Sequence, residues 1–512
     1  MAKKGINADK VAETSEVNRL LEQDNTPWYR KTNLRTLYLA LIPAALGVEM
    51  TTGYDGSVLN GLQAVDRWNE QYNNPTGATL GIISASLAIG TAAGVPIMPY
   101  INDHFGRKAC VLIGSVVVAI GVVIQTCAIN VGMLIASRLI MGLGSPVSLA
   151  GAAQLVAELA YPKERSTITG FFQGTWYVGA ILAAGVTLGT YNWPNNWSWR
   201  LPTLLQILPS LLTLFTIWFI PESPRWLVGQ DRDEEALAIL IKYHAEGDET
   251  SPFVAAEFLQ IRETIHKERE AAKRPWKEIV TTSANRYRVF IAICVGFFTQ
   301  WSGNGLISYY LAKVLSLIGI TSRATQNQLN LGLNCWNLVT ATISSLLAGF
   351  VMRRKQLLSG YVSMTILFAC YTACSAIYNE SDDQAAAKAV VALIFIYNAA
   401  YNLIQPFQYL YIGEIFPFIQ RSKGIAVMQL SVRIASAFNL LVNPIGMADL
   451  GWKFFLVYVV WLVVETTTVY FFFPETQGLT LEEVALVIEG NKAPVEVINT
   501  KASSIAAAEE RA

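Results

Sequence analysis

The sequence predicts an all-α membrane protein in which twelve transmembrane helices form two pseudo-symmetric six-helix bundles. The first observation is composition: of 512 residues, 53% are hydrophobic and 15% are charged, whereas a soluble protein carries about 25% charged residues. The second is that the apolar residues gather in runs of about 20, the length a helix needs to cross a bilayer. The third is a repeat, because residues 158–166 and 414–422 each contain a Glu, an Arg seven residues later and then a Ser. One membrane-embedded unit therefore occurs twice.

Twelve apolar runs define the expected spans. They are residues 36–60, 78–101, 109–129, 131–157, 167–190, 201–220, 289–316, 327–351, 357–379, 385–413, 424–447 and 453–473. The middle loop is rich in Glu, Lys, Arg and Ala at helical spacing, which predicts short amphipathic helices there. The expected parts are an N-terminal cytoplasmic tail (1–35), a six-helix bundle (36–220), a cytoplasmic loop with short helices (221–288), a second six-helix bundle (289–473) and a C-terminal cytoplasmic tail (474–512).

The distribution of basic residues predicts the orientation in the membrane. Lys and Arg are concentrated on the side that holds both termini, and basic loops stay in the cytoplasm. We therefore expect a multi-pass plasma-membrane protein with both termini in the cytoplasm.

Two N-x-S/T sequons, at Asn196 and Asn379, fall on the predicted outside loops and are glycosylation candidates, with chance occurrence as the alternative. The formal net charge is zero, so bulk charge favours no nucleic-acid partner.

The two halves match at further points in the same order. Pro221-Glu222-Ser223 follows the sixth span, and Pro474-Glu475-Thr476 follows the twelfth. Gly106-Arg107-Lys108 follows the second span, and Arg353-Arg354-Lys355 follows the eighth. Two six-helix bundles with a substrate bound between them near the bilayer midplane are a known plan of secondary transporters.

Several short motifs occur in a fixed order along the chain. They are Gly53-Tyr-Asp-Gly56, Asp103-His-Phe-Gly-Arg-Lys108, Arg138 with Gly142 and Gly144, Pro221-Glu-Ser-Pro-Arg-Trp226, Gln300 with Gly303 and Tyr309-Tyr310, and Pro474-Glu-Thr-Gln-Gly478. The ordered set resembles the sugar porter family of the major facilitator superfamily over roughly the whole chain between the tails. Within that family, the chain is most similar to fungal hexose and lactose-permease-type sugar:proton symporters. The resemblance implies the major facilitator fold and sugar import by alternating access, with a proton as coupling ion and no other cofactor.

The resemblance also implies a cytoplasmic gate that locks the outward-facing state. Its residues would be Asp103, Arg107, Glu158, Arg165, Glu222, Arg225, Glu414, Arg421 and Glu475. Acidic and basic groups at helix ends on one face can form ion pairs that must break when that face opens, and they gain further from the helix dipoles. The alternative is that these charges only set topology and contact lipid headgroups.

Several charged residues lie within the apolar runs, and two of them are Asp55 in the first span and Arg138 in the fourth. Charges inside a membrane are costly, so each is a functional candidate that should have a partner. An Asp that exchanges a guanidinium partner for an apolar environment can take up and release a proton. We therefore expect Asp55 and Arg138 to couple transport to protons, with a static ion pair as the alternative.

A sugar site needs amides for the hydroxyl groups and aromatic rings for the apolar C–H face. The candidate amides are Gln173, Gln300, Asn304 and Asn337, and the candidate rings are Trp176, Tyr309, Tyr310, Trp336 and Tyr409. Arg433 could hydrogen-bond sugar hydroxyls or pair with Glu49. Hydrogen bonding between helices is the alternative role for each amide, and packing is the alternative for each ring.

Departures from the family pattern bear on the substrate. Gly305 stands where relatives have Asn, and the tenth span has Gln405 to Tyr409 where hexose carriers often have Gly-Pro and a Trp. Smaller groups leave more room, which favours a disaccharide such as lactose or cellobiose, with a hexose as the other choice.

Other functional classes fit the sequence less well. A facilitative uniporter and a non-transporting sugar sensor of the same fold are the alternatives. An enzyme is not expected, because the three histidines (104, 244 and 266) all lie in predicted cytoplasmic segments and no nucleophile–base pair is visible. No metal-ligand spacing is present, and we expect the protein to work as a monomer.

Overall fold

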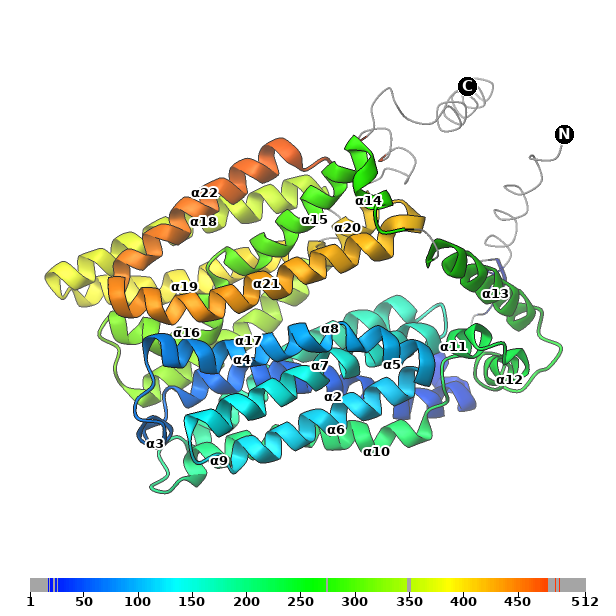
Figure 1. Ribbon diagram of the computed structural model, residues 1–512, viewed down its shortest axis with the longest axis horizontal. Coiled ribbons are helices and arrows are strands. Elements are labelled where there is room, and N and C mark those ends of the chain that lie inside the picture. The colour runs from blue at the N-terminus through cyan, green and yellow to red at the C-terminus, as the bar shows by residue number, and fades with distance from the viewer. Residues whose placement is uncertain are drawn as a thin grey trace. The chain divides into compact units, whose positions relative to one another are not determined.

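The computed structural model describes residues 17, 19–21, 24, 26–272, 275–347, 351–477, 484 and 488. All the regular secondary structure in this part of the chain is helical (Figure 1). The predicted all-α class is therefore confirmed. Most of the predicted C-terminal tail lies outside the described residues.

Ten stretches of the described helices are long and apolar enough to cross a membrane. They are Thr32–Leu62, Gly77–Gly94, Arg107–Thr126, Val131–Leu159, Thr167–Thr190, Trp197–Phe219, Ser283–Leu317, Arg353–Ser381, Gln384–Ile415 and Gln420–Phe472. The last stretch contains two helices, α21 (Phe418–Leu450) and α22 (Phe455–Phe472), joined by η3 (Gly451–Phe454). The expected eighth span falls on α17 (Arg323–Leu347), which is not among these ten stretches. Each of the twelve predicted runs overlaps a helix within the described residues.

The first of two compact units runs through Ala272 and also includes Ser308–Ala312 and Thr321–Cys335. Its elements before the middle loop are η1 (Trp28–Arg30), α2 (Thr32–Leu62), α3 (Asp66–Gln71), α4 (Gly77–Gly94), α5 (Ile97–Phe105), α6 (Arg107–Thr126), α7 (Val131–Leu159), α8 (Arg165–Thr190), α9 (Trp197–Leu205), α10 (Ile207–Thr216) and η2 (Ile217–Phe219). Helix α7 packs on α4 and α6, and α2 packs on α8 and α10. These helices form one bundle in Figure 1.

Two glycines of α2 let this helix approach α8 closely. A Cβ atom on Gly53 would overlap the backbone carbonyl oxygen of Trp176, and a Cβ atom on Gly56 would lie 3.2 Å from the Trp176 ring. Membrane helices associate largely through van der Waals contact, which small residues permit. The two glycines of the Gly53-Tyr-Asp-Gly56 motif therefore set how near the first span comes to the fifth.

The predicted amphipathic helices of the middle loop are present. They are α11 (Pro224–Gly229), α12 (Asp233–His244), α13 (Pro252–Ala272) and α14 (Glu278–Thr281). The first three belong to the first unit and the fourth to the second. Helix α13 is longer than expected for a connecting loop, at 21 residues.

Two sets of contacts fix α12 and α13 on the first unit. The Glu246 carboxylate accepts hydrogen bonds from the backbone N–H groups of Asn33 (2.9 Å) and Leu34 (3.0 Å), which a helix start leaves without an internal acceptor. His244 and Glu257 are buried and joined by a 2.7 Å hydrogen bond. Glu257 also lies 3.9 Å from Arg165 at the start of α8. The loop helices are thus attached to the N-terminal ends of the first and fifth spans.

The second unit comprises residues 275–307 and 313–320 and the chain from Trp336 onward. Its helices are α14, α15 (Ser283–Trp301), most of α16 (Asn304–Leu317), the second part of α17, α18 (Arg353–Ser381), α19 (Gln384–Ile404), α20 (Phe407–Ile415), α21 and α22. Helix α18 packs on α19 and α22, and α15 packs on α21.

Two spans of this unit are interrupted. Gly303 has φ 101° and separates α15 from α16, a backbone conformation that glycine adopts without strain. Helix α19 ends at Ile404 and α20 begins at Phe407, on either side of Pro406. An interrupted span exposes backbone carbonyls that must find hydrogen-bond donors inside the protein.

The position of the second sequon differs from the prediction. Asn379 does not lie on a loop, because α18 continues to Ser381 and ends at Asp382 in the left-handed conformation. The Asn379 side-chain amide donates to the carbonyl oxygens of Ser375 (3.1 Å) and Leu317 (3.3 Å). Asn196, in contrast, is exposed and precedes the first residue of α9. Glycosylation of either residue stays a prediction.

We predict that Gly53→Ala destabilises the protein by about 1–3 kcal/mol, because the added methyl group overpacks the contact between α2 and α8. The measurement is the apparent melting temperature of the purified protein in detergent. Gly185→Ala is the matched control, since a Cβ atom on this α8 glycine meets nothing within 4 Å. The control should be neutral or stabilising by up to about 1 kcal/mol, the difference in helix propensity. Equal changes in melting temperature for the two substitutions would contradict the prediction that the close contact between α2 and α8 leaves no room for a methyl group at Gly53.

Candidate functional site

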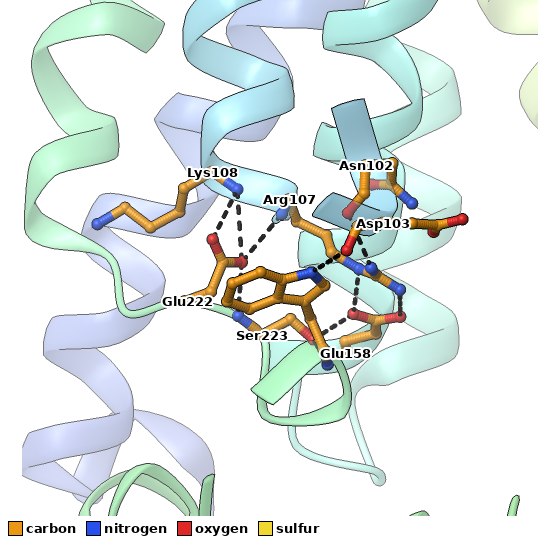
Figure 2. A network of polar contacts seen from close by, with 8 residues as sticks. Asn102, Asp103, Arg107, Lys108, Glu158, Glu222 and Ser223 are labelled. Atoms are coloured by element: carbon orange, nitrogen blue, oxygen red, sulfur yellow. Dashed lines mark hydrogen bonds and ion pairs between the residues drawn. The ribbon is translucent and has the colours of Figure 1, made fainter. Parts of the chain in front are cut away.

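Charged residues from several helix ends of the first unit form one network (Figure 2). Arg107, the first residue of α6, donates from Nε and Nη2 to the two carboxylate oxygens of Glu158 on α7, at 3.1 and 3.3 Å. The Ser223 hydroxyl donates to the same carboxylate. Such bidentate, charge-assisted contacts are stronger than neutral hydrogen bonds. They hold the N-terminal end of α6, the C-terminal end of α7 and the start of α11 together.

A second carboxylate in this network caps a helix. Glu222 accepts hydrogen bonds from the backbone N–H groups of Arg107 (3.1 Å), Lys108 (3.2 Å) and Ser223 (2.8 Å). The first two are at the N-terminus of α6, where the helix dipole favours negative charge. Figure 2 shows Glu222 turned toward both backbone nitrogens. The Pro221-Glu222-Ser223 motif therefore caps the N-terminal end of α6, the third span.

The second unit contains a network of the same design. Arg353, the first residue of α18, donates from Nε and Nη2 to Glu414 on α20, both at 3.3 Å. The Thr476 hydroxyl donates to the other oxygen of Glu414 at 2.5 Å. Glu475 accepts from the backbone N–H groups of Arg353 (3.0 Å), Arg354 (3.1 Å) and Thr476 (3.0 Å). Each contact has a counterpart in the first unit, so the sequence repeat is also a repeat of hydrogen bonds.

The other gate candidates have different surroundings. Arg165 lies 3.9 Å from Glu257 of α13. The backbone carbonyl of Asp103 accepts from the Trp226 indole N–H at 3.0 Å, and its side chain is exposed. Within the described ranges, Arg225 and Arg421 form no ion pair. The structure thus brings five of the nine gate candidates into the two repeated networks: Arg107, Glu158, Glu222, Glu414 and Glu475.

Burial perturbs one of these carboxyl groups. Removal from water raises the pKa of Glu222 above its usual range, although the N–H donors that it accepts from act in the opposite direction. The folded protein therefore takes up a proton at Glu222 more readily than the unfolded chain does.

Asp55 and Arg138 are both buried within the first unit, each with 3% of its surface exposed. They lie on α2 and α7 and interact electrostatically, without a direct ion pair within 4 Å in the described part of the chain. The Gln206 side-chain amide, between α9 and α10, donates a hydrogen bond to Asp55 Oδ1. Arg138 Nε and Nη1 have no acceptor among the described residues. Arg138 therefore has N–H donors available beside a buried carboxyl group, an arrangement that suits a proton site or a ligand site.

Two other sugar-site candidates in this unit, Tyr309 and Tyr310, lie near the same pair. Tyr309 and Tyr310 interact electrostatically with Arg138, and Tyr310 is completely buried. The Tyr309 backbone carbonyl accepts from the Gln63 side chain at 2.8 Å. Trp176 is half-buried against Gly56. Gln173 lies on α8, but its side chain is outside the described residues.

In the second unit, two candidate amides flank the break between α15 and α16. Gln300 is the second-last residue of α15, and Asn304 is the first residue of α16. The Gln300 side chain is half-exposed and makes no hydrogen bond to the described residues. Asn304 Oδ1 is buried and has no donor among them. A free amide can donate to and accept from sugar hydroxyls.

The remaining candidates of the second unit have structural partners. Asn337 Oδ1 accepts from Asn402 Nδ2 at 3.3 Å, which is the interhelical role that was the alternative for each amide. The Trp336 ring is exposed, and its N–H donates to the Phe395 carbonyl at 2.8 Å. Tyr409 is also exposed and accepts from Gln429. Arg433 is half-buried, and its Nε has no acceptor among the described residues.

Several polar residues in the spans were not singled out by the sequence interpretation. They are Gln206, Asn402, Asn439, Asn443 and Tyr458. Four of them are amides within apolar runs, which is the signal that identified Gln300, so the same criterion could have found them. Glu465 of α22 is fully buried beside Ser302 and Trp461. In the described ranges, no group of three or more His, Cys, Asp or Glu is suited to hold a metal ion.

Comparison with known sequences decides the family. The sequence model of the family described as "Sugar (and other) transporter" matches residues 40–487. The chain belongs to this transporter family. The resemblance inferred from the motifs is confirmed, and the prediction that the protein is not an enzyme is confirmed by the nature of the family.

The curated relatives are fungal transporters. The high-affinity glucose transporter of Kluyveromyces lactis is 28% identical over 457 residues, which cover 84% of this chain and 81% of the relative. The high-affinity glucose transporter 1 of Candida albicans is 27% identical over 88% of this chain and 85% of the relative.

Solved structures agree on the fold. The inward-open conformation of the xylose transporter XylE from E. coli matches with a TM-score of 0.73 at 22% identity, covering 88% of this chain and 99% of that structure. A partially occluded inward-open form of the same transporter matches with a TM-score of 0.71 at 21% identity, covering 87% of this chain and 99% of that structure. At this identity the likeness establishes the major facilitator fold.

We predict that the stability of the Glu222→Gln variant, measured relative to wild type, increases as pH rises from about 4 to 8. A carboxyl whose pKa is raised on folding contributes stability at low pH and loses that contribution as pH rises through its folded pKa, whereas Gln does not titrate. The measurement is the difference in melting temperature between Glu222→Gln and wild type at each pH. Glu70→Gln is the control, because Glu70 is exposed and pairs only with the neighbouring Arg67. A difference that is constant with pH would contradict the raised pKa.

Proposed function

We propose that the protein imports a sugar together with a proton by alternating access across the plasma membrane. The observation that carries the proposal is the buried Asp55 carboxyl, which lies within a membrane span and interacts with Arg138. A buried carboxyl that changes partner between two conformations can couple proton uptake to a conformational change. Membership of the transporter family supports the wider assignment.

In this mechanism, the proton and the sugar bind from outside. Protonation of Asp55 removes its attraction to Arg138, so α2 and α7 are free to adjust against each other. The donors on Arg138 and the hydroxyl groups of Tyr309 and Tyr310 lie close to this pair. Sugar binding near them would therefore be sensitive to the charge on Asp55. The two repeated networks at the cytoplasmic helix ends hold each bundle rigid while the inner face opens and closes.

The second unit supplies the other sugar contacts. The Gln300 and Asn304 amides sit at the break between α15 and α16 and have unused hydrogen-bonding capacity. A broken span places backbone and side-chain polar groups at membrane depth, where transporters bind their substrates. Gln300 and Asn304 are therefore the leading substrate contacts of this unit.

The substrate class is a hexose or a disaccharide. The named relatives from Kluyveromyces lactis and Candida albicans are glucose transporters, which supports a hexose. The expectation that Gly305 leaves more room is wrong, because the side chain of Asn439 fills the space beside it. The Gln405 to Tyr409 stretch, which lacks the Trp of hexose carriers, still supports a disaccharide. Facilitated uniport is the second candidate, because the names of these two relatives state no coupling ion.

The experiment that tests the substrate is uptake into proteoliposomes over a panel of hexoses and disaccharides, with and without a protonophore. We expect accumulation of at least one sugar above its outside concentration, driven by an inward proton gradient and abolished by the protonophore. Uptake that equilibrates and ignores the protonophore would establish uniport. Signalling by the sugar without uptake would establish a sensor.

We predict that Asp55→Asn abolishes uphill sugar accumulation and preserves sugar exchange across the membrane. Asn cannot exchange a proton, but it keeps the shape of the side chain and can still accept from Gln206. The measurement compares accumulation under a proton gradient with counterflow at equal pH on the two sides. Glu380→Gln is a control, because this residue is exposed at the end of α18. Normal accumulation by Asp55→Asn would eliminate Asp55 as the coupling residue.

A further inference from the structure

The break between α15 and α16 leaves backbone carbonyls at the end of α15 without helical partners, and side chains from neighbouring spans satisfy them. The Tyr401 hydroxyl donates to the Thr299 carbonyl at 2.8 Å, and the Tyr397 hydroxyl donates to the Ser302 carbonyl at 2.6 Å. Asn439 Nδ2 donates to the Gln300 carbonyl at 2.7 Å. Buried backbone carbonyls need such donors in a membrane. The last turn of α15 is therefore held by α19 and α21.

The bond from Asn439 differs from the others because it fixes a candidate sugar residue. Asn439 is 6% exposed, and its Oδ1 accepts from the Tyr458 hydroxyl of α22 at 2.6 Å. The Tyr458 hydroxyl also contacts Asn443 Oδ1 one helical turn further along α21. Asn439 thus has its donor committed to Gln300 and its acceptor committed to Tyr458. The amide cannot rotate without breaking both hydrogen bonds.

The space for this amide exists because residue 305 has no side chain. A Cβ atom on Gly305 would lie 2.5 Å from Asn439 Nδ2 and 3.5 Å from Asn443 Nδ2. Real Cβ atoms do not approach an amide nitrogen to 2.5 Å, so any side chain at position 305 displaces Asn439 from the Gln300 carbonyl. Gly305 and Asn439 are therefore complementary, with one residue of α21 filling the volume that one residue of α16 leaves open.

We propose that Asn439 and Tyr458 are positioning residues that set the affinity for the sugar by fixing the backbone of Gln300. This inference rests on the proposed function, in which the Gln300 amide binds sugar hydroxyls. A side-chain amide on a helix end moves with its backbone, and a rigid amide loses less freedom on binding than a mobile one. The Asn439 hydrogen bond therefore affects the equilibrium of sugar binding and not the rate of the conformational cycle. Its loss raises the dissociation constant of the sugar and leaves the maximal exchange rate nearly unchanged.

The test measures sugar dissociation constants of the purified full-length protein and its exchange kinetics in proteoliposomes. The probe is the sugar that wild type transports best in the uptake panel. Asn439→Asp keeps the acceptor for Tyr458 but lacks the N–H donor, and we expect it to raise the dissociation constant about five- to tenfold, the effect of one hydrogen bond. Tyr458→Phe keeps the bond to Gln300 and should raise the dissociation constant about two- to threefold. The maximal exchange rate should stay within about twofold of wild type in both variants.

A double-mutant cycle separates positioning from general packing. Gly305→Ala should weaken binding about as much as Asn439→Asp, because the methyl group displaces the Asn439 amide. In an Asn439→Ala background, the same Gly305→Ala substitution should have no further effect, since the amide is gone and the methyl group has room. Coupling of this kind is expected only for residues that act through the same contact. An equal effect of Gly305→Ala in both backgrounds would overturn the proposal.

Asn398→Ala is the matched control. Asn398 is equally buried, at 3% exposure, but donates within its own helix to the Ile394 carbonyl, so the sugar dissociation constant should not change. If wild type binds no sugar of the panel, the proposed function fails. If wild type binds sugar and Asn439→Asp binds it with the same dissociation constant, the positioning role alone fails.

Discussion

An unpaired polar group inside hydrocarbon costs several kcal/mol, and this cost explains most of the specific contacts in the structure. The backbone of an unbroken span satisfies itself, so polar side chains are needed only where a helix begins, ends or breaks. Glu222, Glu475 and Glu246 receive the N–H groups at the starts of three helices. Tyr397, Tyr401 and Asn439 donate to carbonyls at the end of α15. Side chains of these six residues therefore satisfy backbone groups at helix starts and at the break after α15.

The same requirement explains which features the sequence could predict. The length and order of the apolar runs were sufficient for the twelve spans, because a bilayer fixes the length of a span. The repeated Glu, Arg and Pro-Glu-Ser/Thr motifs predicted two equivalent clusters, since like sequences at like helix ends make like hydrogen bonds. The Glu158 and Glu414 contacts match at the level of individual donors.

What the sequence could not predict involves partners far apart in the chain. Gln206 meets Asp55 across 151 positions, and Asn439 meets Gln300 across 139. Periodicity identifies such amides as unusual but not which carbonyl or carboxylate they reach. The loop assignment of Asn379 was wrong for a local reason, because polar residues at the end of a membrane helix look like a loop although the backbone stays helical to Ser381. Trp336 was selected as an aromatic residue of a span, but a pattern cannot tell a ring that faces a ligand from one that faces lipid.

The two units are equivalent in the networks at their helix ends and differ within the spans. The first unit holds the buried Asp55 and Arg138, whereas the second holds an interrupted span with amides at its break. Duplication thus supplies a common framework, and the charged pair and the broken helix are separate additions to it. Such a division allows substitutions that alter sugar recognition in the second unit to leave the charged pair of the first intact.

The hydrogen bonds from Asn33 and Leu34 to Glu246 also bear on how the protein is made. The acceptor lies 213 residues after the first donor, so the start of the first span lacks this cap until nearly half of the chain has been synthesised. At about 5–20 residues per second, the delay is on the order of 10–40 seconds. The six helices of the first unit are all translated before α12 can dock on them. The middle loop therefore docks on spans that are already synthesised, whereas Ser308–Ala312 and Thr321–Cys335, which also belong to the first unit, are translated later.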